Sequence, residues 1–237
     1  MQSDSSVTQA LQLLMQQDAA LISVVTLSLR VSATACLLGA GLGLLLGAAL
    51  AVGRFAGRKL VIGLFNTLLA LPSVVVGLVV YLLLSRSGPL GSWGILFTPS
   101  AMVIAQAILV VPIVAALSRE LVSDALDQGG EQLRALGAGR MLCAALMLLH
   151  ERRALLTLLL TAFGRAVSEV GAVMVVGGNI AGQTRVMTTA IALETSKGDL
   201  PMALALGLVL LGVVGLINLL ITLVNGSQRA QVRGLSI

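Results

Sequence analysis

Two ionisable residues lie inside an otherwise apolar run in the second half of the chain. Arg165 and Glu169 are four residues apart, so a helix would place them on one face. A lone charge at the centre of a bilayer costs at least about 2.5–3.5 kcal/mol, and an opposite charge one turn away offsets part of that cost. The two residues are predicted either to form an internal ion pair that orients the helix or to line a transport pathway or gate. Arg30, in an earlier apolar run, would supply positive potential for an anion or extend its side chain to the membrane surface.

A segment rich in hydrogen-bond donors follows the same run. Gly177-Gly178-Asn179 predicts a flexible break. The candidate donors for an anion are Asn179, Thr184, Arg185 and Thr188. Amide, hydroxyl and guanidinium groups can donate to the oxygens of an anion, and basic side chains line known anion pores. The alternative is an external loop whose polar groups contact water or another protein.

Charged residues, scarce elsewhere, gather between residues 119 and 153. Gly129-Gly130 is predicted to break the chain, and a short helix is predicted from Glu131 to Leu136 that ends at Gly137. An acidic residue at a helix start favours the helix dipole, and a glycine after the last helical residue suits the left-handed cap. This segment is either a solvated connection with one amphipathic turn or a docking element for a cytoplasmic partner.

The composition sets the surroundings in which these groups must work. Hydrophobic residues make up 57% of the 237 residues and charged residues only 11%, whereas a soluble domain carries about 25% charged residues. Lipid is therefore the natural solvent of this chain. The net charge of +5 is scattered over segment ends, and the sequence contains no nucleic-acid-binding motif, so membrane orientation explains the charge better than nucleic acid does.

Five runs are long enough to cross a bilayer, which takes about 20 mainly apolar residues. They are residues 20–52, 60–84, 99–118, 154–177 and 202–225. The fold class predicted is an all-α integral membrane protein with five transmembrane helices. Its parts would be an extracytoplasmic tail at 1–19, a transmembrane domain at 20–225 with a cytoplasmic loop at 119–153, and a cytoplasmic tail at 226–237.

Local signals refine these spans. Pro72 and Pro112 lie inside the second and third runs and are expected to bend them. Thr98-Pro99 and Asp199 are expected to begin the third and fifth helices. Glycines at every fourth position of the first run (Gly39, Gly43 and Gly47) form a flat face, expected to pack against another helix of the same subunit rather than across a dimer.

Lysine and arginine counts predict the orientation. The connections after the first, third and fifth runs contain ten of these residues, namely Arg54, Arg58, Lys59, Arg119, Arg134, Arg140, Arg152, Arg153, Arg229 and Arg233. The opposite side contains three, namely Arg86, Arg185 and Lys197. Because basic residues stay in the cytoplasm, the N-terminus is predicted outside and the C-terminus inside.

Several classes of chemistry lack the residues they need. No glycine-rich phosphate loop ending in Gly-Lys-Ser/Thr occurs, so any ATP would be handled by another chain. The single histidine, His150, and the cysteines Cys36 and Cys143 have no metal-site spacing. We therefore predict no catalysis, no metal and no directly bound cofactor. A passive channel is the remaining alternative, but it leaves the polar segment around Glu131 unexplained.

The segment Glu131-Gln-Leu-Arg-Ala-Leu-Gly137, followed by Met147 and Leu149, resembles the signature loop of bacterial ABC-importer permeases. The acid, the glycine and the apolar end are in register. Gln132 and Leu133 replace the two alanines of that loop, and His150 replaces its proline. The resemblance implies a type I importer permease (MetI-like) fold. In this family the short helix sits in a cleft of the ATPase subunit, a role that would fall to Glu131, Arg134, Ala135, Leu136, Gly137 and Ala138.

The stretch from Gly164 to Thr195 is similar to the permeases that import tetrahedral oxyanions, most closely those for tungstate, with molybdate and sulfate as alternatives. This resemblance implies an inner-membrane homodimer with two cytoplasmic ATPase subunits, which use ATP and Mg, and an extracytoplasmic binding protein that delivers the ion. The permease itself would have no catalytic residue.

Overall fold

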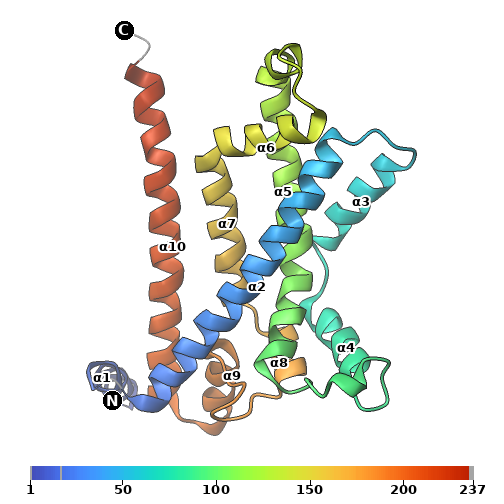
Figure 1. Ribbon diagram of the computed structural model, residues 1–237. Helices are drawn as coiled ribbons and strands as arrows, with labels where there is room; N and C mark the ends of the chain where they lie inside the picture. Colours follow the sequence, from blue (N-terminus) through green and yellow to red (C-terminus); the bar gives the residue numbers. More distant parts are fainter. Residues whose placement is uncertain (1, 17, 235–237) are drawn as a thin grey trace. The chain divides into compact units, whose positions relative to one another are not determined.

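The computed structural model describes residues 2–16 and 18–234, and the side chains of 6–16 and 18–225. All regular elements in these ranges are helical (Figure 1). In chain order they are α1 (Gln2–Met15), α2 (Ala19–Val52), α3 (Arg58–Leu68), α4 (Ser73–Leu84), the 3-10 turn η1 (Gly91–Trp93), α5 (Pro99–Ala135), α6 (Arg140–His150), α7 (Arg152–Val167), α8 (Gly171–Gly177), α9 (Met187–Lys197) and α10 (Leu200–Gly234).

Three helices are long and apolar enough to cross a membrane: α2, α5 and the Leu200–Asn225 part of α10. Two further candidates are bent pairs, α3 with α4 at 101° and α7 with α8 at 53°. The bend in the run 60–84 was expected, since Pro72 lies at it with no N–H to donate. The break in the run 154–177 was not expected, and that run is wrong as a single continuous helix.

Other local expectations are confirmed. The helix α5 begins at Pro99. Pro112 lies inside this helix, and the bend expected there stays a prediction. Asp199 precedes α10, and its Oδ1 accepts the Met202 N–H at 3.2 Å, as a helix cap should. The region expected to be an N-terminal tail instead contains the helix α1, where Val7, Ala10 and Leu11 have helical spacing and Ala10 is fully buried.

The chain divides into two compact units. The first, unit 1, contains the described residues up to Ala35 together with Pro72–Gln106 and Arg165–Leu216. The second, unit 2, contains Cys36–Leu71, Ala107–Gly164 and the described residues from Ile217 onward. Each unit is described by itself below.

In unit 1, α4 packs closely against α8. A Cβ on Gly77 would lie 2.8 Å from the Cα of Ala172, and one on Gly171 would lie 2.6 Å from Val74 Cγ2. These glycines therefore let the two backbones approach each other, as small residues do in membrane helices. The largest fully buried side chains of this unit are Met102, Val173, Val176, Met187 and Leu206.

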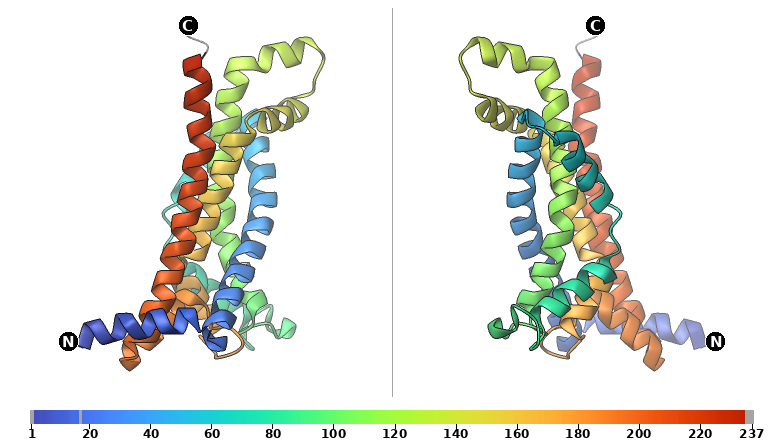
Figure 2. Two further views of the ribbon diagram at one scale, coloured as in Figure 1. Left: turned by 90° about the vertical axis from the view of Figure 1, so that its left-hand side faces the viewer. Right: turned by 90° about the vertical axis from the view of Figure 1, so that its right-hand side faces the viewer.

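In unit 2, the glycine face of α2 packs on α5, as expected for helices of the same subunit. A Cβ on Gly39 would lie 2.6 Å from Val110 Cγ1, and one on Gly43 would lie 2.6 Å from Val114 Cβ. The two helices run side by side here in both views of Figure 2. This close packing anchors the part of α5 that precedes the polar segment identified in the sequence.

Candidate functional site

The predicted turn at Gly137 is present and follows the end of α5. Gly137 has a φ of +82°, in the left-handed region that favours glycine. Its N–H donates to the Arg134 carbonyl at 2.9 Å, and the Ala138 N–H donates to the Leu133 carbonyl at 3.0 Å. This pair of bonds is a Schellman motif, in which the backbone itself satisfies the carbonyls freed at a helix end.

The predicted chain break at Gly129-Gly130 is wrong, because α5 continues through both residues to Ala135. Glycine keeps its N–H, so it weakens a helix by about 1 kcal/mol relative to alanine without interrupting the hydrogen-bond ladder. A Cβ on Gly130 would lie 3.1 Å from Leu126 Cδ2. The expected separate helix from Glu131 is therefore the last part of α5, and Figure 2 shows this end of the helix turning aside before the chain doubles back into α6.

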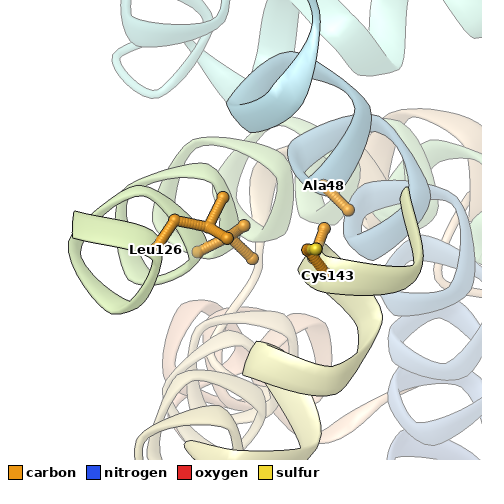
Figure 3. Packing of buried hydrophobic residues seen from close by; sticks show 5 residues of the cluster. Ala48, Leu126 and Cys143 are labelled. Atoms are coloured by element: carbon orange, nitrogen blue, oxygen red, sulfur yellow. The ribbon is translucent and has the colours of Figure 1, made fainter. Parts of the chain in front are cut away.

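A small apolar cluster holds this turn on the rest of unit 2. The cluster comprises Ala48 of α2, Val122 and Leu126 of α5, and Cys143 and Ala144 of α6 (Figure 3). Leu133 and Ala138, the two ends of the longer Schellman hydrogen bond, pack against it. A change at the turn is therefore mechanically connected to α2, α5 and α6, because all three contribute to this core.

Side chains on the outer side of the turn are free of this core. Glu131, Arg134 and Ala135 are exposed, and Leu136 is 84% exposed. Leu149 of α6 is 68% exposed. Next to the turn, α5 and α6 border a groove of about 400 Å³ whose polar lining residues are Gln128, Gln132, His150 and Glu151.

The seven residues predicted to line a pathway all lie in unit 1. Arg165 and Glu169 do not form the predicted ion pair. The helix α7 ends at Val167, so Glu169 lies in the break before α8 rather than one turn along the same helix. Its Oε1 accepts the Ala172 N–H at 3.1 Å, while the Arg165 side chain is exposed.

Side chains from other elements satisfy the carbonyls freed by this break. Gln106 Nε2 donates to the Ala166 carbonyl at 2.9 Å, and Thr188 Oγ1 donates to the Glu169 carbonyl at 2.8 Å. Gln106 is 3% exposed and Thr188 7% exposed. The Ala166 carbonyl also accepts the Glu169 N–H at 3.2 Å, so Gln106 adds a second bond there. A buried unpaired carbonyl costs about 1–3 kcal/mol, so the Thr188 hydroxyl stabilises the break at the Glu169 carbonyl. Thr188 was identified in the sequence but as an anion ligand, and Gln106 was missed although it is a polar residue in an apolar run.

The loop after α8 also uses predicted anion donors internally. Thr184 is fully buried; its hydroxyl donates to the Gly177 carbonyl and accepts the Ile180 N–H. Asn179 has a φ of +51°, and its Nδ2 donates to the Thr189 carbonyl at 3.2 Å. The hydroxyl of Thr184 thus shapes this loop, and it has no donor left for a bound ion.

Arg185 differs from the other six residues because it has a buried side-chain N–H without a partner. Its Nη1 lies 3.7 Å from Glu194 Oε1 and its Nη2 donates to the Asn179 carbonyl at 3.5 Å, while its buried Nε has no hydrogen-bond partner. Glu194 is 9% exposed and also pairs with Lys197 at 3.0 Å. The sequence interpretation missed Glu194, although an acid nine residues after an arginine in an apolar helix was a usable signal.

Two remaining predictions concern single residues. Arg30 lies in α2, and its side chain is exposed. Both cysteines are free and buried, as expected of packing residues. Within the described residues, no group of three or more His, Cys, Asp or Glu side chains is arranged to hold a metal ion.

Comparisons with known proteins place the chain in a family. Residues 39–236 match the model of the family described as binding-protein-dependent transport system inner membrane component. The chain is 43% identical over 212 residues to a tungstate uptake system permease protein of Peptoclostridium acidaminophilum. This alignment covers 90% of this chain and 93% of that protein. It is 42% identical over 205 residues to a probable anion ABC transporter permease protein of Haloferax volcanii, covering 84% and 88%.

A sulfate transport system permease protein of Escherichia coli is more distant, with 37% identity over 141 residues, covering 55% of this chain and 47% of that protein. The matched family and the two long alignments together span the Gly137 turn and the broken helix. The chain therefore belongs to the inner-membrane components of binding-protein-dependent transport systems, the non-catalytic permease subunits of ABC transporters, whose partners are an ATPase and a binding protein.

Proposed function

We propose that this chain is the transmembrane subunit of an ATP-driven importer for tungstate. The observation that carries the proposal is the 43% identity to a tungstate uptake permease over nearly the full length of both chains. Sulfate permeases match at lower identity, from 37% over 141 residues to 29% over 220 residues, which favours tungstate over sulfate. Molybdate is the second candidate because it is also a tetrahedral dianion of similar size.

The turn at Gly137 is the proposed contact with the ATPase. Leu136 and Leu149 are apolar side chains that remain exposed in the single chain, and Glu131 and Arg134 flank them with opposite charges. An exposed apolar anchor with a charged rim is the usual composition of a protein interface. Because Leu133 and Ala138 pack on the α2–α5–α6 core, a displacement of the turn would be passed to helices α2 and α5.

Arg185 is the proposed contact with the transported anion. It is a part-buried guanidinium with an unpartnered Nε, and its long 3.7 Å contact with Glu194 is weak enough to be exchanged for an oxyanion. Glu169, Thr184 and Thr188 are proposed to shape this region rather than to bind the ion, since their polar groups are engaged with the backbone. Asn179 orients Arg185 through its carbonyl.

The proposed topology has five spans, with the N-terminus outside and the C-terminus in the cytoplasm. It counts each bent pair, α3–α4 and α7–α8, as one span, and it is supported by the excess of basic residues on the side of the Gly137 turn. Residues 20–225 would form the transmembrane domain. The tail at 226–237 is helical up to Gly234, its side chains lie outside the described residues, and it is proposed to be cytoplasmic. Two copies are proposed to form the transport path.

Transport measurements test the substrate. The permease, its ATPase and its binding protein are reconstituted in liposomes, and ATP-dependent uptake of tungstate, molybdate and sulfate is compared. We expect uptake to require ATP. Of the three anions, tungstate should saturate uptake at the lowest concentration. Preference for sulfate would contradict the substrate, and uptake without the ATPase would contradict the class of transporter.

Labelling tests the topology independently of transport. A cysteine placed at Leu136, which is 84% exposed, should not react with a membrane-impermeant maleimide in intact cells. It should react once the membrane is permeabilised and the reagent reaches the cytoplasmic face. Reaction in intact cells would place the turn outside and remove its role as the ATPase contact.

A further inference from the structure

A basic pocket of about 400 Å³ lies in unit 2, between the C-terminal end of α2 and the turn that joins α5 to α6. Four arginines line it, and none of its lining residues is acidic. They are Arg54, Arg58, Arg134 and Arg140. The floor is apolar, because Leu126 and Cys143 of the buried cluster also line it. Four cationic side chains around an apolar floor create a positive electrostatic potential that attracts an anion.

The neighbouring groove shows that this charge is specific to one side of the turn. That groove has the same volume, about 400 Å³, and also lies between α5 and α6. Its ionisable lining residues are His150 and Glu151, and it contains no arginine. The arginines are therefore concentrated in the pocket at α2 and are not spread evenly over this end of unit 2.

One arginine is held in position by the backbone. Arg58 Nε donates to the Leu50 carbonyl at 2.8 Å and its Nη2 donates to the Ala51 carbonyl at 3.2 Å. These bonds use two of the five N–H donors of the guanidinium and leave three for a ligand. They also satisfy carbonyls at the end of α2, so the guanidinium is fixed before any ligand arrives.

The position of the pocket relative to the bilayer follows from the sequence of α2. Residues 31–53 contain no charged side chain, and this stretch of helix is about 35 Å long at 1.5 Å per residue. The hydrocarbon core of a bilayer is about 30 Å thick. When α2 crosses the membrane, Arg54 must therefore lie at the level of the lipid headgroups.

The next helix also fits this level. No residue of α3 is buried, and Leu60 and Leu64 are 80% and 56% exposed, as is half of Phe55 just before the helix. A helix that begins with Arg58 and Lys59 and exposes apolar side chains from Leu60 onward is suited to start among the headgroups and to enter the bilayer as the first half of the bent α3–α4 span.

We propose that the four-arginine pocket binds the phosphate of an anionic phospholipid headgroup. Guanidinium groups form paired hydrogen bonds with phosphate oxygens, and basic pockets at the ends of membrane helices take anionic headgroups. The acyl chains of the lipid would extend along the exposed side chains of α3. Acidic side chains of the ATPase are the competing occupant, and the headgroup depth of Arg54 and the uncovered apolar face of α3 favour the lipid.

The test compares three double variants of the full-length permease, purified with its ATPase in nanodiscs. Arg54→Gln with Arg140→Gln removes two charges from the pocket. Arg152→Gln with Arg153→Gln removes two charges from residues at the start of α7 that do not line the pocket and is the matched control. Arg54→Lys with Arg140→Lys keeps the charge. The measurement is the number of phosphatidylglycerol molecules retained after delipidation, by native mass spectrometry, with phosphatidylcholine as the neutral probe.

We expect the glutamine pair to lower the apparent affinity for phosphatidylglycerol about twentyfold, since each basic side chain near an anionic surface contributes several-fold. The control pair should retain the lipid as the wild type does, and the lysine pair should retain most of it, which also shows that the pocket still folds. Equal retention by the glutamine pair and the wild type, or equal loss in the control pair, would overturn the proposal.

Two further measurements separate the other occupants. If millimolar inorganic phosphate protects the wild type in neutral detergent against thermal unfolding as well as phosphatidylglycerol does, the occupant is a free anion and the lipid assignment is wrong. If the glutamine pair loses its ATPase in pure phosphatidylcholine, the arginines bind acidic residues of the partner and the lipid assignment is again wrong. Neither result depends on which ion is transported.

Discussion

The turn after α5 and the break between α7 and α8 both interrupt a helix, but they satisfy the freed backbone groups differently. At the turn, the backbone does so alone through the left-handed Gly137 and two hydrogen bonds. At the break, Gln106 and Thr188 donate to the carbonyls, and Glu169 accepts an N–H. At the turn, the exposed neighbouring side chains are therefore not used for backbone hydrogen bonds and remain free. At the break, side chains form those hydrogen bonds and are no longer available to a ligand.

This difference separates two kinds of polar residue that look alike in the sequence. Glu131 and Arg134 are exposed and available to a partner, whereas Thr184 and Thr188 are buried and engaged in the fold. Substitutions near the turn should therefore affect assembly with little loss of stability. Substitutions at the break should lower the stability of the permease itself.

Gly137→Val should have the largest effect. A β-branched residue at a φ of +82° is strained by about 1–3 kcal/mol, so the Schellman turn should open. We expect stimulation of the ATPase by the permease to fall at least about tenfold. Gly137→Asn is the matched control, because asparagine tolerates the left-handed conformation and should keep most of the stimulation. Full stimulation with Gly137→Val would show that the turn is not the coupling element.

Leu136→Ala should have the second-largest effect, and it tests whether the side chains of the turn act in assembly rather than in stability. Leu136 is 84% exposed in the permease, so its removal should leave the melting temperature unchanged. If it anchors the ATPase, the dissociation constant of the complex should rise about tenfold or more. Leu211→Ala, at a 69% exposed leucine of α10, is the control for a general loss of exposed apolar surface. A drop in the melting temperature without weaker ATPase binding would contradict the assignment.

Thr188→Val tests the break. Valine has nearly the shape of threonine but cannot donate to the Glu169 carbonyl, so unfolding should become easier by about 1–3 kcal/mol. The measurement is thermal unfolding in detergent. Thr161→Val is the control, since that exposed hydroxyl bonds only to the carbonyl one turn back in its own helix. Equal melting temperatures for the two variants would mean that the Glu169 carbonyl finds another donor.

Two double-mutant cycles should give the smallest effects. Neutral replacements of Arg165 and Glu169 should be additive within about 0.5 kcal/mol, because the two residues do not pair. Replacements of Arg185 and Glu194 should show a coupling of about 1 kcal/mol, since the two are partly buried and 3.7 Å apart. Coupling in the first cycle but not in the second would reverse the assignment of the ion pairs.

Features with a local cause were predictable from the sequence. The left-handed turn at Gly137, the bend at Pro72 and the cap at Asp199 each depend on one residue and its immediate neighbours. The six proposed coupling residues were found by a motif that includes such a feature. The helix running through Gly129-Gly130 was not predicted, because a glycine pair occurs in turns as well as inside helices that continue through it.

The break at Glu169 had no local signal. Its donors Gln106 and Thr188 are 60 and 19 residues away from their acceptors, so only the folded chain brings them there. The helical spacing of Arg165 and Glu169 suggested an ion pair because it assumed a continuous helix. The same limit applies to the basic pocket, since its arginines come from three separate segments of the chain.

The amino-acid sequence alone determined that this protein belongs in lipid, that it is helical, and that a left-handed turn lies at Gly137. These properties depend on hydrophobicity and on proline and glycine conformation. Such signals act over a few residues, so they can be read without knowledge of the fold. Only the tertiary structure decided which helices are broken and which polar side chains remain free for partners. The reason is that a freed backbone carbonyl in a membrane protein must find a donor, and folding chooses that donor from distant parts of the chain.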